Sequence, residues 1–112
     1  MSYVNWIELN AIQQLENIKE LSKIRSQVIF KHSTRCAISS MALQRLERIS
    51  PPDQIDFYFL DLLRYRSVSN KIAVEFYVHH QSPQILLIRN MECIYEESHG
   101  GIEMEEIVAQ AK

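Results

Sequence analysis

Apolar residues form two kinds of pattern along the chain. One is a repeat typical of helices, and the other is a short continuous run typical of buried strands. From residue 9 to residue 24 they recur at every third position, which keeps them on one face of a helix. Shorter runs at 27–31 and 55–62 are rich in β-branched and aromatic residues and predict strands, the second buried on both faces. Helical spacing returns at 36–49 and 65–76, which predicts two more helices.

The last third of the chain predicts a hairpin and a final helix. A polar turn ends at Pro83, and two strand-length runs follow at 84–89 and 92–97. Their two-residue connection is short enough for an antiparallel hairpin. Gly100 and Gly101 then open a helix whose first turn is acidic, as the helix dipole favours.

These elements predict one α/β domain spanning residues 1–112. Strands alternating with helices imply a central mixed sheet flanked by helices on both faces. A length of 112 residues supports one such core and is short for two. The order of elements, with Cys36 after the first long strand and Pro83 before the hairpin, resembles the thioredoxin fold.

Charge and hydropathy argue against two classes of partner. Twelve Lys and Arg face fourteen Asp and Glu, and the charges are scattered, so we expect no nucleic-acid partner. No apolar run approaches the roughly 18 residues of a membrane span, and the first residues lack a basic and apolar leader. We therefore expect no membrane partner and a cytoplasmic protein, in which a structural disulfide between its two cysteines would be exceptional.

Cys36 is the candidate nucleophile. A free thiol with a pKa of about 8.5 is only a few per cent thiolate at neutral pH, and the thiolate is the reactive form. Unpaired N–H groups at a helix start and the neighbouring Arg35 would both stabilise the anion. The preceding residues are polar and include two possible N-cap residues, Ser33 and Thr34, so the helix start should be exposed. The alternative is that Cys36 is a small buried apolar residue.

The spacing around Cys36 indicates a one-cysteine site. In Cys36-Ala-Ile-Ser39 a hydroxyl stands where a dithiol oxidoreductase has its resolving cysteine. Ser39 can donate a hydrogen bond to the thiolate, but it cannot close a disulfide. An outside thiol must therefore resolve a mixed disulfide at Cys36, since Cys93 lies in a predicted hairpin strand where a structural role is favoured.

The segment Phe30-Lys-His-Ser-Thr-Arg-Cys36, followed by Ile38-Ser39, resembles the monothiol bacilliredoxins, the YtxJ-type proteins of bacillithiol systems. The likeness continues through 59–66 and Ser82-Pro-Gln84. One departure is Ala37, where the family usually has a proline suited to the first helical turn. The resemblance implies removal of bacillithiol, or another small thiol, from S-thiolated client proteins. The small thiol would be a co-substrate, and no metal or bound cofactor is implied.

The resemblance also implies residues that bind the substrate. Ser82-Pro83 is similar to the cis-proline turn of thioredoxin folds, whose preceding backbone pairs with the bound disulfide. Gly100 and Gly101 stand where related proteins hold a carboxylate of a small thiol on a helix N-terminus, although a plain turn is the alternative.

Parallel strands would place two arginines at the Cys36 edge of the sheet. Arg64 and Arg66 follow a strand predicted to run parallel to the one before Cys36, so they would either meet the malate carboxylates of bacillithiol or simply face solvent. The remaining candidate, His32, lies four residues before Cys36 and is either a base or hydrogen-bond partner there, or structural.

Two other functions compete with this enzyme. Monothiol glutaredoxins bind an iron–sulfur cluster at a Cys-x-x-Ser site together with a small thiol, so cluster carriage is one alternative. A non-catalytic module that holds a client protein is the other. A zinc site is not indicated, because two cysteines and four scattered histidines form no ligand set with suitable spacing.

Overall fold

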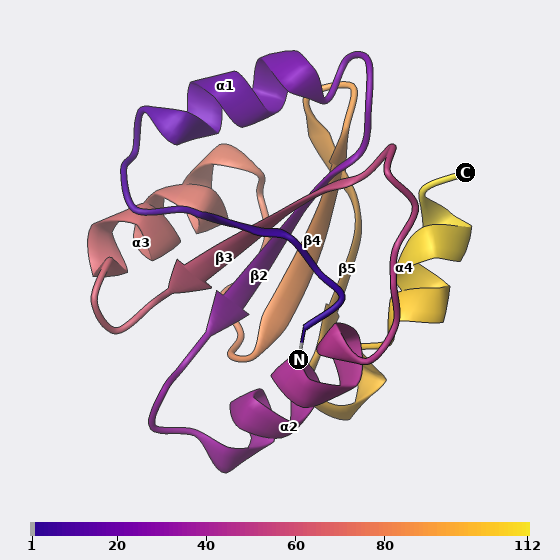
Figure 1. Cartoon of the computed structure of the whole chain (residues 1–112). Coiled ribbons are helices and arrows are strands. Elements are labelled where there is room, and N and C mark those ends of the chain that lie inside the picture. Colours follow the sequence, from indigo (N-terminus) through magenta and orange to yellow (C-terminus); the bar gives the residue numbers. More distant parts are fainter. Residues whose placement is uncertain (1) are drawn as a thin grey trace.

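The computed structural model describes residues 2–112 and has one five-stranded sheet of order β1-β3-β2-β4-β5 (Figure 1). Neighbouring strands are parallel from β1 through β3 to β2, whereas β4 is antiparallel to both β2 and β5. The strands are β1 (Trp6–Glu8), β2 (Gln27–His32), β3 (Asp56–Asp61), β4 (Gln84–Arg89) and β5 (Glu92–Ser98). The helices are α1 (Gln14–Leu21), α2 (Ala37–Glu47), α3 (Arg66–Glu75), the short 3₁₀ helix η1 (His99–Gly101) and α4 (Met104–Gln110). The predicted mixed sheet with flanking helices is confirmed.

A core lies on each face of the sheet. Helices α1 and α3 cover one face, and α2 and α4 cover the other (Figure 1). Successive side chains of a strand point to opposite faces, so β2 gives Ile29 to the first core and Val28 and Phe30 to the second. All six residues of β2 are buried.

The N-terminal segment differs from the prediction. Strand β1 was not predicted, because it has only three residues and two of them are exposed. The first helix, predicted from residue 9 to residue 24, forms only over Gln14–Leu21. Leu9 instead extends the pairing with β3 by donating its N–H to the Phe59 oxygen at 2.9 Å. The end of the predicted apolar stripe, Ile24, is exposed.

Helix α2 buries only part of the face that its apolar spacing predicted, since Ala42 and Leu46 are in the core as expected. Its buried residues are Ser39, Ala42 and Leu46, whose small or aliphatic side chains face the sheet. Ile38 and Met41, which we expected in the core, are 51% and 59% exposed. The periodicity failed here because a polar residue, Ser39, occupies a buried position of the helix. Apolar surface is therefore left in the first turns of α2, close to Cys36.

Strand β2 also buries a charged residue. The Lys31 side chain is 1% exposed, on the α1 and α3 face of the sheet. Burial lowers the pKa of Lys31 from its ordinary 10.5 to about 8, although the negative charge of Glu96 acts in the opposite direction.

This shift predicts a pH-dependent contribution of Lys31 to stability. Between pH 8 and 10.5 the unfolded chain holds a proton on Lys31 that the folded chain lacks, so stability rises with pH in this window. From about pH 7 to about pH 10, the free energy of unfolding of the wild type should rise by about 2 kcal/mol relative to Lys31→Met. Urea denaturation of both proteins measures the difference, in which other titrating groups cancel. A difference that is constant across this range would contradict the prediction.

Candidate active site

Three loops leave the sheet at the same end of its strands, where β2 and β3 end and β4 begins. In the parallel pair of β2 and β3, His32 lies opposite Asp61, and the N–H of Leu62 donates to the His32 oxygen at 3.0 Å. Strand β4 runs the other way, and its first residue, Gln84, lies opposite Lys31. The loop to α2, the loop to α3 and the turn before β4 are therefore neighbours, as the predicted topology requires.

Cys36 is the N-cap residue of α2. Its backbone is extended, and its carbonyl oxygen accepts the N–H of Ser40 at 3.1 Å. The thiol is half-buried, and the first turn of α2 has no acidic residue to oppose a negative charge at the helix N-terminus. The expectation that Ser33 or Thr34 caps the helix is wrong, because Thr34 lies in an exposed turn and the helix begins at Ala37. Ala37 thus occupies the first helical position, where proline also fits.

Ser39 lies in the first turn of α2, on the side that faces the sheet, and is fully buried. Its hydroxyl has two partners. Its Oγ lies 2.6 Å from His32 Nδ1 and accepts the N–H of Ser33 at 3.0 Å. The expected partner of this hydroxyl was the Cys36 thiolate. The hydroxyl donates to Nδ1 when the proton of the ring is on Nε2. It is released for another acceptor when Nδ1 carries the proton.

His32 is a buried, uncharged residue at neutral pH. Its ring packs against the rings of Phe30 and Phe59, with centroids 5.8 and 5.3 Å away. Burial lowers the pKa of His32, and the charges of Asp61 and Glu47 offset this only in part. The partner that the structure gives His32 is the buried hydroxyl of Ser39, which agrees with the structural alternative, and a role as a base or partner for Cys36 stays a prediction.

The predicted cationic residues lie in exposed positions. Arg35 is in the turn before Cys36, and Arg64 and Arg66 follow β3 at the same edge of the sheet. The guanidinium of Arg64 lies over the ring of Tyr65, 5.5 Å from its centroid. These side chains are accessible to an anionic ligand, and their role in binding stays a prediction.

The Ser82–Pro83 peptide bond is cis, as the resemblance implied. Pro83 is buried, and its carbonyl oxygen accepts the N–H of His99 at 3.1 Å, which joins this turn to η1. Ser82 is half-buried.

The expectation that Gly100 and Gly101 form the N-terminus of the last helix is wrong. Both residues belong to η1, and α4 begins only at Met104. A Cβ atom on Gly101 would lie 2.5 Å from Cδ of Glu97, so a carboxylate already occupies this place. The glycines therefore do not form a helix N-terminus that could hold an anion.

Cys93 differs from Cys36 in its surroundings. It lies on β5 opposite Ile88, in the half of the sheet farther from the Cys36 edge, and its thiol donates to the Tyr95 oxygen at 3.4 Å. Burial raises the pKa of Cys93 to about 11, so its thiolate is scarce at neutral pH. This environment favours the structural role predicted for it.

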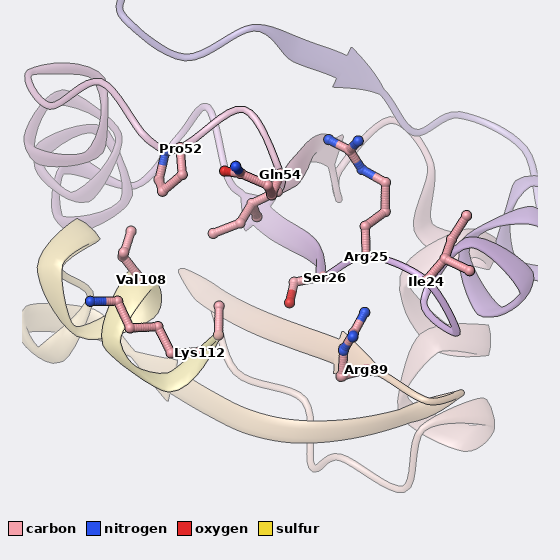
Figure 2. A pocket seen from close by; sticks show the side chains of 10 residues that line it. Ile24, Arg25, Ser26, Pro52, Gln54, Arg89, Val108 and Lys112 are labelled. Carbon is pink, nitrogen blue, oxygen red and sulfur yellow. The ribbon is translucent and has the colours of Figure 1, made fainter.

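A cavity lies at the opposite end of the sheet. It has a volume of about 600 Å³ and opens where β2 begins and β4 ends, with Arg25, Arg89 and Lys112 around it (Figure 2). None of the predicted site residues lines it. Within residues 2–112, no group of three or more His, Cys, Asp or Glu side chains is placed to hold a metal ion, and no helix is long and apolar enough to cross a membrane.

The fold and the single cysteine at a helix N-terminus define a thioredoxin-fold protein with a one-cysteine site. A solved structure described provisionally as an oxidoreductase with a thioredoxin fold is 27% identical, with a TM-score of 0.81 over 95% of this chain and 93% of that one. The chain belongs to the family Monothiol bacilliredoxin BrxC, whose model matches residues 7–107. Family and fold together support a redox role.

Two thioredoxins support the fold at lower identity. Thioredoxin of Malassezia sympodialis is 15% identical, with a TM-score of 0.79 over 99% of this chain and 94% of its own. Thioredoxin of Schistosoma mansoni is 20% identical, with a TM-score of 0.75 over 98% of each chain. The predicted thioredoxin-like fold is thus confirmed.

The environments of the two cysteines predict selective alkylation. At about pH 8, iodoacetamide should modify Cys36 and leave Cys93 unmodified, because only thiolate reacts and Cys93 titrates near 11. Intact-mass spectrometry should find one adduct on the wild type and on Cys93→Ser, and none on Cys36→Ser. Two adducts on the folded wild type would contradict the assignment.

Ser39→Ala should destabilise the fold. The change removes the hydroxyl that contacts His32 and accepts the Ser33 N–H, and it leaves these groups without a partner beneath α2. We expect a loss of about 1 to 3 kcal/mol in urea denaturation. Ser40→Ala, at the next and only half-buried position, is the matched control and should change the free energy of unfolding little. Equal effects of the two changes would argue against the Ser39 hydrogen bonds as the cause.

Proposed function

We propose that this protein is a monothiol thiol–disulfide oxidoreductase that removes bacillithiol, or a similar small thiol, from S-thiolated proteins. The observation that carries the proposal is the position of Cys36. The thiol is half-exposed at the N-terminus of α2, and Ser39 stands where a resolving cysteine would be. Membership of the bacilliredoxin family supports this choice of reaction.

The reaction has two exchange steps. The Cys36 thiolate attacks the bacillithiol sulfur of the mixed disulfide, the new S–S bond forms on Cys36, and the client cysteine leaves as a thiolate. The thiolate of a second bacillithiol then attacks the bacillithiol sulfur on Cys36. This releases Cys36 thiolate and bacillithiol disulfide. In the net reaction the mixed disulfide of the client is exchanged for bacillithiol disulfide, and one bacillithiol thiol is consumed for each client thiol released, so no metal or bound cofactor enters the balance.

An external thiol is needed because the chain offers no internal one. Ser39 has no sulfur, and Cys93 lies away from the Cys36 edge with a pKa of about 11. Attack by Cys93 on a disulfide at Cys36 would require the hairpin to leave the sheet. Such a reaction suits a reducing cytoplasm in which the small thiol is abundant.

The surface around Cys36 suits a substrate that is part protein and part acidic small thiol. The backbone before Pro83 stands at the same edge, where we propose that it pairs with the disulfide-bearing strand of the client. Exposed Ile38 and Met41 offer apolar contact to a protein chain. Arg64 and Arg66 are placed to bind the carboxylates of bacillithiol.

Intact-protein mass spectrometry tests the proposal directly. The reduced wild type and Cys93→Ser, treated with bacillithiol disulfide, should each gain one bacillithiol, and added bacillithiol should remove it. Cys36→Ser should gain none and should lose activity on a bacillithiolated peptide by at least about a thousandfold, because the nucleophile is gone. A parallel treatment with glutathione disulfide reports which small thiol is preferred. Equal loss of activity in Cys36→Ser and Cys93→Ser, or no adduct on the wild type, would overturn the proposal.

A further inference from the structure

A polar network lies inside the sheet next to the Ser82–Pro83 turn. Lys31 Nζ is 2.6 Å from His80 Nδ1 and donates to Gln84 Oε1 at 3.0 Å. Lys31 and Gln84 are both fully buried and lie opposite each other on β2 and β4. His80 belongs to the loop between α3 and β4. An ammonium group is thus held beneath the loop that carries Ser82 and Pro83.

The side chain of Gln84 forms hydrogen bonds with the backbone of this loop. Its Oε1 also accepts the N–H of Gln81 at 3.3 Å, and its Nε2 donates to the His79 oxygen at 3.1 Å. On the other side of β4, the same Nε2 lies 3.3 Å from a carboxylate oxygen of Glu96. One amide therefore holds two backbone groups of the loop, and Lys31 holds that amide.

The position of the loop consequently depends on Lys31. With Lys31 in place, the ammonium satisfies Gln84 and His80 at once, and the loop has anchors on both sides of Gln81. Without it, His80 loses its buried partner and Gln84 Oε1 loses its charged one, so both side chains become free to turn. An apolar residue at position 31 would fill the space but hold neither group.

We propose that Lys31, His80 and Gln84 are positioning residues that hold the backbone before Pro83 in place for the incoming disulfide substrate. The inference rests on the exchange reaction proposed above, and it assigns to that reaction three residues which do not touch the substrate. They act on substrate binding through the loop at 79–83. Nucleophilic attack by Cys36 does not involve them directly.

The test compares Lys31→Met and His80→Ala with the matched control His79→Ala. His79 is the exposed neighbour of His80, and it takes part in the network only through its backbone oxygen. The assay follows release of bacillithiol from a bacillithiolated peptide, with bacillithiol as the second thiol. We expect KM for the peptide to rise about fivefold or more in Lys31→Met and His80→Ala, kcat to change less than about twofold, and His79→Ala to match the wild type.

Amide hydrogen exchange supplies a readout that does not depend on activity. The Gln81 amide should exchange faster in Lys31→Met and His80→Ala than in the wild type and His79→Ala, because its acceptor is less firmly held. If the buried change in Lys31→Met prevents folding, the exposed change in His80→Ala still decides the question.

The outcomes separate this inference from the proposed function. An active wild type whose KM is unchanged in Lys31→Met and His80→Ala would overturn the positioning role alone. Loss of kcat without a rise in KM would do the same. A wild type without activity on the peptide would refute the proposed reaction, and the positioning role would fall with it.

Discussion

The site depends on the pairing of β2 with its two neighbours. A parallel strand on one side and an antiparallel strand on the other bring the end of β3 and the beginning of β4 to the end of β2. Each neighbour then leaves the sheet as a loop beside the one that carries Cys36. If either pairing shifted by one residue, side chains would exchange between the two cores, so the packing of both cores fixes the register and thereby the site.

The environments of the two thiols assign them different chemistry. Cys36 has a helix N-terminus, an accessible surface and no acidic residue in the adjoining turn. Cys93 has a backbone carbonyl as hydrogen-bond partner, apolar neighbours and a raised pKa. The sequence alone favoured this division, because one cysteine follows a polar stretch and the other lies in a predicted strand of the hairpin. The structure adds the physical cause, which is burial.

Most of the architecture was predictable from the sequence, and the failures have identifiable causes. Short runs rich in β-branched and aromatic residues, which became β2 and β3, were placed to within one residue. The three-residue strand β1 has no periodicity to detect. At Gly100 and Gly101 a glycine pair was interpreted as a helix start, whereas it forms a 3₁₀ turn closed against Glu97. A glycine pair suits a turn and a helix start alike, so it does not by itself locate the first residue of α4.

Side-chain pairing was the least predictable part of the site. The sequence left His32 either as a partner for the thiol or as a structural residue, and its contact with Ser39 follows from the way α2 packs on the sheet. The network around Lys31 was missed because a lysine in a strand is normally exposed, and His80 is far from it in sequence. A signal was present in the strand itself, since a lysine within a run buried on both faces needs a polar partner.

Consecutive residues of β2 therefore anchor the two halves of the site. Side chains alternate along a strand, so Lys31 and His32 point to opposite faces. His32 contacts Ser39 in the first turn of α2, next to Cys36. Lys31 reaches Gln84 beneath the turn that we propose receives the substrate. Because both anchors belong to the most buried strand of the sheet, the start of α2 and the turn before β4 are held to one rigid element, and their relative position is set without a direct contact between them.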